Sequence, residues 1–394
     1  MVKAIDIVCN MYTPEAVDSR RSMDDNFKSQ VRMPPDMRDG VSMEDYLKRM
    51  DRAGIERSFL VAVRAGDMRV RGSSEIPYDQ VAEVCNKYPD RFSGLAGVDT
   101  TRGMQGLRDL EYAVNKLGFV GAHWYPHWFG IPPDAPQIYP YYAKCCELDI
   151  PIMMQVGHNL VYSRERRLPS VAKPILLDQV AIDFPELVLI GIHIGWPWTE
   201  EMIAMAWKHP NVFIGLDAYA PKHWPASMVH YANTFGQDKV LFGTDWPVID
   251  PERAVAELEM HNFRPDALRK ILRDNAVRIF KLDERLERPK ASKGEAAPTV
   301  AQWRPDADQL ARSPRRWPLM RWEEGCPVCC GMCGEPLPAT GSCAWCGTNP
   351  DQEPPMLAPL ADLFSERKVC ATCGVDQSTR LAPARCPGCG EPPA

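Results

Sequence analysis

The first 285 residues alternate short apolar runs with stretches of helical spacing, and this repeated pattern constrains the fold more than any other feature. Such alternation is typical of βα units that build a parallel sheet. The eight predicted strands cover residues 4–9, 58–63, 93–98, 120–124, 152–156, 188–193, 212–217 and 240–244.

Amphipathic stretches between these runs, residues 171–184 among them, predict the intervening helices. Leu107, Leu110, Val114 and Leu117 recur at helical spacing, and Ser42 is positioned to cap a helix that follows it. Eight such units over this length predict an α/β fold, a (β/α)₈ TIM barrel. A doubly wound open sheet is the alternative, but it would need a glycine-rich turn after the first strand, which residues 9–14 lack.

The fourteen cysteines are unevenly distributed, because ten of them lie between Cys326 and Cys389. Four Cys-x-x-Cys-Gly knuckles occur there, the first two separated by nine residues and the last two by twelve. This spacing lets four thiolates surround one tetrahedral ion, so the segment resembles a double zinc ribbon with two structural zinc ions. The predicted zinc ligands are Cys330, Cys333, Cys343, Cys346, Cys370, Cys373, Cys386 and Cys389. Disulfides are the alternative.

Composition then predicts three parts: a barrel over residues 1–285, a linker or docking segment over 286–325 and the cysteine-rich double zinc ribbon over 326–394. The linker ends in a run of arginine and tryptophan over residues 315–322, which either docks to another surface or packs back onto the barrel. Closed zinc sites leave no open position for catalysis, so we expect the ribbons to contact a protein partner. With four basic residues after Cys326, the ribbons are poorly suited to nucleic acid.

The net charge of −6 gives no basic field for nucleic acid or an anionic membrane. The most apolar stretch, residues 187–198, is too short to span a bilayer. The first residues lack the pattern of a signal peptide, which disfavours disulfides in the cysteine segment. We therefore expect a cytoplasmic protein, and a homo-oligomer, that acts on a small molecule.

Polar and aromatic residues gather where the predicted strands end, which is where barrel enzymes carry their active sites. These residues are His123 and His127 after the fourth strand, Gln155 and His158 after the fifth, His193 after the sixth, Asp217 at the seventh and Asp245 at the eighth. Nearby tryptophans and tyrosines indicate an apolar or planar substrate.

Three stretches resemble the late motifs of the amidohydrolase-related family of metal-dependent barrel hydrolases and decarboxylases. They are Leu-Ile-Gly-Ile-His-Ile-Gly at 189–195, Leu-Phe-Gly-Thr-Asp-Trp-Pro at 241–247 and Asn-Ala-Val-Arg-Ile-Phe at 275–280. The likeness covers residues 3–282. It implies that His193 assists catalysis as an acid/base or carboxylate binder, and that Asp245 binds a metal and moves a proton.

The sequence departs from that family at the expected metal ligands. Val8 and Asn10 stand where the family carries His-x-His, and Gln155 stands where it carries a histidine. Zinc prefers imidazole and thiolate, so these residues would hold it poorly. His158 could substitute if its loop turns back, and whether the barrel holds a divalent metal stays open.

We therefore expect an enzyme that hydrolyses or decarboxylates a small cyclic or aromatic carboxylic acid or acyl derivative. Asp245 and His193 would be its acid/base pair. The residues expected to bind substrate are Gln155, His158, His123, Asn10 and Trp246. The alternative is an accessory subunit with a metal-depleted barrel, which docks to a partner enzyme through its zinc ribbons.

Overall fold

The computed structural model describes residues 3–19, 23–162 and 166–286. The predicted zinc ribbon, and the linker from residue 287 onward, lie outside these residues. Eight parallel strands form one sheet, in the order β1-β2-β5-β6-β7-β8-β9-β10. The strands are β1 Ala4–Asn10, β2 Ile55–Ala62, β5 Phe92–Gly97, β6 Gly121–Trp124, β7 Ile152–Gln155, β8 Leu189–Ile192, β9 Val212–Leu216 and β10 Val240–Phe242.

The sheet curls until its first strand meets the segment that follows its last strand. Cys9 forms a parallel bridge with Trp246, and the Asp245 backbone N–H donates to the Val8 carbonyl oxygen at 2.9 Å. The Asn10 N–H donates to the Trp246 carbonyl oxygen at 2.9 Å. The (β/α)₈ barrel predicted from the sequence is confirmed, and all eight predicted strands are present.

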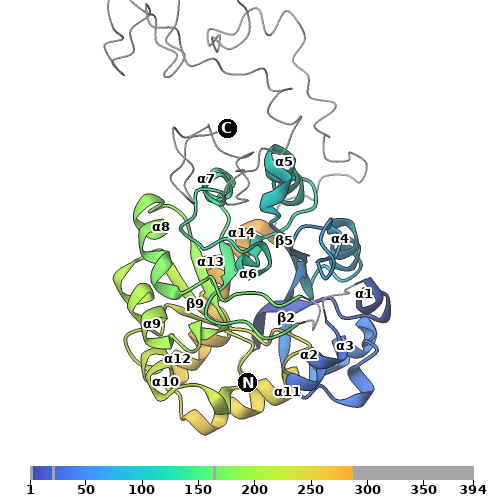
Figure 1. Ribbon diagram of the computed structural model, residues 1–394. Coiled ribbons are helices and arrows are strands. Elements are labelled where there is room, and N and C mark those ends of the chain that lie inside the picture. The colour runs from blue at the N-terminus through green and yellow to red at the C-terminus, as the bar shows by residue number, and fades with distance from the viewer. Residues whose placement is uncertain (1–2, 20–22, 163–165, 287–394) are drawn as a thin grey trace, which may run out of the picture. The chain divides into compact units, whose positions relative to one another are not determined.

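Helices cover the outer side of the barrel, as Figure 1 shows. They are α1 Pro14–Ser19, α2 Asp25–Gln30, α3 Met43–Ala53, α4 Tyr78–Lys87, α5 Gly103–Asn115, α6 Pro126–Phe129, α7 Tyr139–Glu147, α8 Leu177–Asp183, α9 Thr199–Lys208, α10 Ala226–Asn233, α11 Pro251–Glu257, α12 Pro265–Arg269, α13 Asn275–Ile279 and α14 Leu282–Leu286. Short 3₁₀ turns cover Pro35–Met37, Thr100–Arg102, Pro174–Leu176, His193–Gly195, Pro221–His223 and Leu258–His261, and a π turn covers Lys270–Asp274.

Local sequence explains where α3 begins and ends. The Ser42 hydroxyl accepts from the Asp45 backbone N–H at 3.1 Å and donates to the Asp45 carboxylate at 2.9 Å. Gly54, with φ of 73°, ends the helix in the left-handed conformation that glycine adopts at little cost. The chain then enters β2 directly, which brings the second strand beside the first.

Two features differ from the sequence prediction. The predicted helix over 171–184 is a 3₁₀ turn at Pro174–Leu176 followed by α8, because Pro174 lacks the N–H that a helix interior needs. After β2 the chain forms a small antiparallel pair, β3 Arg64–Ala65 with β4 Ser74–Glu75. Its two-residue strands are too short to produce an alternating pattern in the sequence.

Candidate active site

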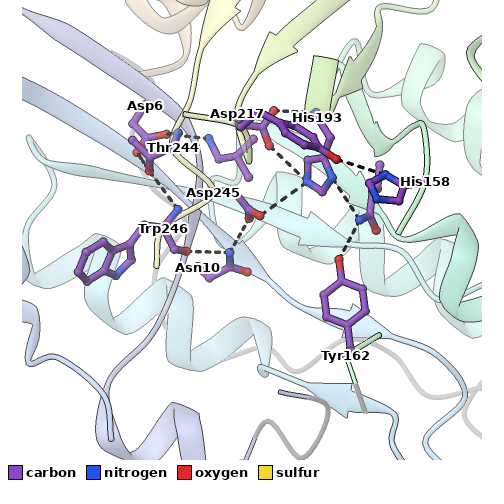
Figure 2. Close-up of polar contacts among 12 residues, drawn as sticks. Asp6, Asn10, His158, Tyr162, His193, Asp217, Thr244, Asp245 and Trp246 are labelled. Atoms are coloured by element: carbon purple, nitrogen blue, oxygen red, sulfur yellow. Dashed lines mark hydrogen bonds and ion pairs between the residues drawn. The ribbon is translucent and has the colours of Figure 1, made fainter. Parts of the chain in front are cut away.

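Three side chains converge where β8, β9 and β10 end. His193 Nε2 lies 3.4 Å from Asp217 Oδ2 and 3.7 Å from Asp245 Oδ2 (Figure 2). The Asp217 side chain is fully buried, whereas that of Asp245 is 18% exposed. Residues that leave neighbouring parallel strands at the same level are held about 4.8 Å apart, which explains why residues distant in sequence meet here.

The backbone turns sharply at each of these three strand ends. His193 has φ of 65°, Ala218 has 63° and Asp245 has 51°, all left-handed values that cost a non-glycine residue on the order of 1 kcal/mol. Two hydrogen bonds hold these turns: the His193 N–H donates to Asp217 Oδ1 at 3.0 Å, and the Asp245 N–H donates to Val8. Strain that neighbouring structure maintains in this way is typical of functional sites.

Gln155, at the end of β7, contacts the other side of the His193 ring. Its Nε2 lies 3.2 Å from His193 Nδ1 and 2.9 Å from the Tyr162 hydroxyl oxygen. When that amide donates to Nδ1, the imidazole proton resides on Nε2, which faces the two carboxylates. Burial, together with neighbouring histidines, lowers the pKa of His193 to about 3, so the ring is uncharged at neutral pH.

The two carboxylates differ in their surroundings. Burial and the nearby Asp245 charge raise the pKa of Asp217 well above its usual range. Asp217 Oδ2 accepts no hydrogen bond from the described residues. Asp245 Oδ1 accepts from Asn10 Nδ2 at 2.9 Å, and the same Asn10 nitrogen donates to the Trp246 carbonyl at 2.8 Å. Asn10 therefore orients Asp245 and also closes the barrel.

His158 and His123 flank this cluster. His158 Nδ1 lies 3.2 Å from the Tyr219 hydroxyl, and its ring meets the Trp196 ring edge-on with centroids 4.6 Å apart. Burial lowers the pKa of His158. His123 is buried with its ring centroid 4.3 Å from that of Tyr125. The predicted residues Asp245, His193, Gln155 and Asn10 are thus directly linked, with the two histidines around them.

Trp246 is the predicted site residue whose side chain lies elsewhere. Its indole points away from His193 in Figure 2 and packs against the Tyr46 ring at 4.8 Å, with the Arg49 guanidinium 5.6 Å from its centroid. The ring therefore packs between the barrel and α3. At this site the backbone of Trp246, rather than its ring, contacts Asn10.

The structure brings two further residues into the site, and neither was assigned a role from the sequence. Asp217 carries a usable signal, since it is the last residue of a predicted strand, as His193 is, and Asp245 directly follows one. Tyr162 has no such signal, because it lies in the loop after β7. Its ring stacks on Phe27 of α2 with centroids 4.7 Å apart, which places its hydroxyl beside Gln155.

The positions that carry metal ligands in the resembling family do not fit an ion in this chain. Val8 is apolar, and the side-chain amide nitrogens of Asn10 and Gln155 face Asp245 and His193. A different group does cluster: among the described residues, one ligand atom each from His193, Asp217 and Asp245 lie within 4.8 Å of one another. These three residues are a possible metal site.

A closed parallel barrel that gathers a buried imidazole and two carboxylates at its strand ends has the architecture of the (β/α)₈ barrel enzymes. The model of the amidohydrolase family matches residues 28–282. The chain belongs to this family, and it is an enzyme of hydrolase or carboxy-lyase type.

Individual relatives agree with this assignment. The chain is 27% identical over 293 residues to a gamma-resorcylate decarboxylase of Rhizobium sp. (strain MTP-10005), which covers 60% of this chain and 86% of the relative. An uncharacterized TIM-barrel protein from Bordetella bronchiseptica superimposes with a TM-score of 0.58 at 25% identity, covering 73% of this chain and all of that protein. A dihydroxybenzoic acid decarboxylase from Polaromonas sp. JS666, with bound manganese, shares the fold with a TM-score of 0.55 at 21% identity, over 73% of this chain and all of that one.

None of the helices in the described ranges is long and apolar enough to cross a membrane.

Proposed function

We propose that this enzyme removes the carboxyl group of a small aromatic acid as CO₂, with Asp245 and His193 as its acid/base pair. The observation that carries the proposal is the contact of His193 Nε2 with both Asp217 and Asp245 at the barrel mouth. The decarboxylase relative supports the reaction type. Hydrolysis of an acyl derivative is the alternative chemistry within the same family.

Exposure assigns different roles to the two carboxyl groups. Asp245 retains some exposure and would be reached by a substrate, whereas the Asp217 side chain is fully buried. In its protonated form Asp245 delivers a proton to the ring carbon that bears the carboxylate. The bond from that carbon to the carboxylate then breaks, its electron pair restores the aromatic ring, and CO₂ leaves. Asp245, left ionised, regains a proton from solvent, with the uncharged His193 Nε2–H beside it to stabilise the negative charge.

Neutral polar groups around the cluster would bind the substrate oxygens. His158, His123 and Gln155 offer hydrogen-bond donors or acceptors, and burial favours the uncharged form of His158. The partly exposed Trp196 and Tyr219 rings add apolar surface of the kind that a planar acid needs. Asn10 would act through Asp245 by holding its Oδ1.

One observation favours a second candidate, an accessory subunit with no turnover. The family's metal ligands are replaced at Val8, Asn10 and Gln155, as expected for a barrel that has lost its reaction. In that case residues 286–325 would act as a linker, and the proposed zinc ribbon over 326–394 would bind a partner enzyme. A stoichiometric partner that co-purifies, and is lost on deletion of residues 326–394, would support this role.

Turnover in D₂O tests the proposed reaction. The purified full-length chain is incubated with a panel of hydroxylated benzoic acids, including 2,6-dihydroxybenzoate, and with ester and lactone analogues. We expect CO₂ release from at least one acid, and one deuterium at the carbon that lost the carboxylate. Ester or lactone hydrolysis without CO₂ release would replace decarboxylation by hydrolysis. No turnover of any compound would contradict the proposed decarboxylation of these substrates and favour the accessory role.

A further inference from the structure

The barrel has a cavity at the end opposite the mouth, where its strands begin. The volume of this cavity is about 510 Å³, which lies in the range of small-molecule sites. The first residues of β1 and β2 line it, together with the turn before β5 and residues of α13 and α14. Barrel enzymes carry their catalytic residues at the other end, so the chemistry proposed for the mouth does not account for this cavity.

Arg57 is a buried cation in the lining of this cavity. It belongs to β2 and is 8% exposed. Its Nη1 donates three hydrogen bonds, to the carbonyl oxygens of Pro89 and Phe92 at 3.1 and 3.0 Å and to the Ser93 hydroxyl at 3.0 Å. Its Nε and Nη2 donate to none of the described residues. The three bonds therefore fix the guanidinium from one corner and leave the edge formed by Nε and Nη2 free.

The charge of Arg57 is not neutralised by an ion pair with any described residue. Two other arginines of the lining do have such partners. Arg91 pairs with Asp51 at 2.7 Å, and Arg273 lies 2.6 Å from a Glu56 carboxylate oxygen. Burial lowers the pKa of Arg57, because water no longer solvates its charge, but an arginine stays protonated at neutral pH. A buried charge of this kind is costly unless an anion reaches it.

The free edge of the guanidinium and the rest of the lining select the kind of anion. Two parallel N–H groups match the two oxygens of a carboxylate, and such bidentate contacts are stronger than single ones. Ile5, Val277 and Leu282 add apolar surface to the lining, which suits a carboxylate attached to a hydrocarbon body. The exposed acidic residues Asp90 and Asp283 also line the cavity. They repel a multiply charged ion more strongly than a monoanion, so phosphate fits less well than a carboxylate.

We propose that this cavity binds a small organic acid with one carboxylate, which accepts a bidentate contact from Nε and Nη2 of Arg57. The hydrocarbon body of the acid lies toward Val277 and Leu282. Because the site is at the opposite end of the barrel from Asp245 and His193, it goes beyond the proposed function and is tested independently of it.

The test is isothermal titration calorimetry of the full-length protein with hexanoate, at neutral pH in Tris chloride. Hexanoate is a monoanion without an aromatic ring, so it differs from the substrate proposed for the mouth. Arg57→Lys should weaken binding at least about tenfold, because an ammonium group does not offer two parallel donors. Arg52→Lys is the matched control. Arg52 is exposed on α3, pairs with Glu252 and lies outside the cavity lining, so its replacement should change the affinity by less than about twofold.

Val277→Glu tests the site without removing the hydrogen bonds of Arg57. Val277 is half-buried on α13, and a glutamate there brings a carboxylate to the cavity, which should abolish hexanoate binding. If circular dichroism shows Arg57→Lys to be unfolded, Val277→Glu decides. The proposed site would be overturned by a wild-type chain that does not bind hexanoate, or by an affinity that stays unchanged in the folded variants. Phosphate binding as tight as that of hexanoate, and equally dependent on Arg57, would overturn the assignment to a carboxylate.

Discussion

The Asp6 carboxylate accepts two hydrogen bonds from Thr244, from its hydroxyl at 2.6 Å and from its backbone N–H at 3.0 Å. This pair joins the first barrel strand to the segment after the last one, beside an irregularity in β1 where the pairing with β2 shifts between Asp6 and Cys9. The Thr244 hydroxyl also accepts from the Trp246 N–H at 3.0 Å. Hydrogen bonds to β1 therefore fix Thr244 and Trp246, the two neighbours of Asp245. These contacts orient Asp245, the proposed proton donor.

Replacing Thr244 by valine should destabilise the barrel and reduce turnover. Valine has nearly the same shape but removes the donor to a buried carboxylate and the acceptor for the Trp246 N–H. We expect a loss of about 2–3 kcal/mol in the free energy of unfolding, measured by urea denaturation. Thr244→Ser retains the hydroxyl and should lose clearly less; equal losses in the two variants would show that the hydroxyl is not what matters.

Asp245→Asn should abolish turnover while leaving the fold intact. The amide cannot deliver a proton as a carboxylic acid does, so we expect kcat to fall by about 10²–10⁴. The Oδ1 acceptor for Asn10 Nδ2 remains, so circular dichroism and Tm should stay close to those of the wild type. The exposed Asp238, paired with Lys270, provides the control variant Asp238→Asn. Activity retained in Asp245→Asn would refute the assignment.

The strands were predictable because apolar runs at barrel spacing leave few other arrangements, but their ends were not. The predicted strands 188–193, 212–217 and 240–244 are longer than β8, β9 and β10, which end at Ile192, Leu216 and Phe242. His193 and Asp217 are as buried as the apolar residues before them, so the predicted strands include them. The strands themselves end earlier, and the backbone turns into the left-handed conformation at His193 and Ala218. The hydrophobic pattern of a sequence indicates which residues are buried, but it does not indicate where the backbone φ angle becomes positive.

The site was predictable to the extent that strand ends converge. That rule brings His193, Asp245, Gln155 and Asn10 together, and the structure agrees on their proximity. The direction in which a side chain points could not be predicted in the same way. Trp246 immediately follows Asp245, yet its ring packs on Tyr46 outside the cluster. Side-chain direction at a turn depends on tertiary packing, so position in sequence could not decide it.

His127 should make the protein less stable in acid. Burial lowers the pKa of His127 to about 4 from a usual 6.5, and Nδ1 accepts from the Val171 N–H at 3.1 Å, which requires an unprotonated nitrogen. Between pH 6.5 and 4 the unfolded chain binds more protons at this residue than the folded one. The free energy of unfolding therefore falls as the pH falls, by about 3 kcal/mol from this residue.

His127→Gln keeps an acceptor for Val171 and removes the titration. Urea denaturation from pH 7 to pH 4 should show a shallower loss of stability in this variant than in the wild type. The exposed His223 supplies the control, His223→Gln, which should follow the wild-type curve. Parallel curves for His127→Gln and wild type would mean that protonation of His127 is not coupled to unfolding.

The cysteine segment, which lies beyond the described residues, should hold about two zinc ions per chain, because each pair of knuckles supplies four thiolates. Inductively coupled plasma mass spectrometry of the full-length protein should find this zinc, and Cys330→Ser with Cys333→Ser should remove about one equivalent. Cys146→Ser is the control, since Cys146 lies half-buried in the barrel as a free thiol. The measurement is repeated with Asp217→Asn, so that zinc at the barrel mouth is not counted with the ribbons. A zinc-free chain in which these eight cysteines resist thiol reagents until reduced would establish disulfides instead.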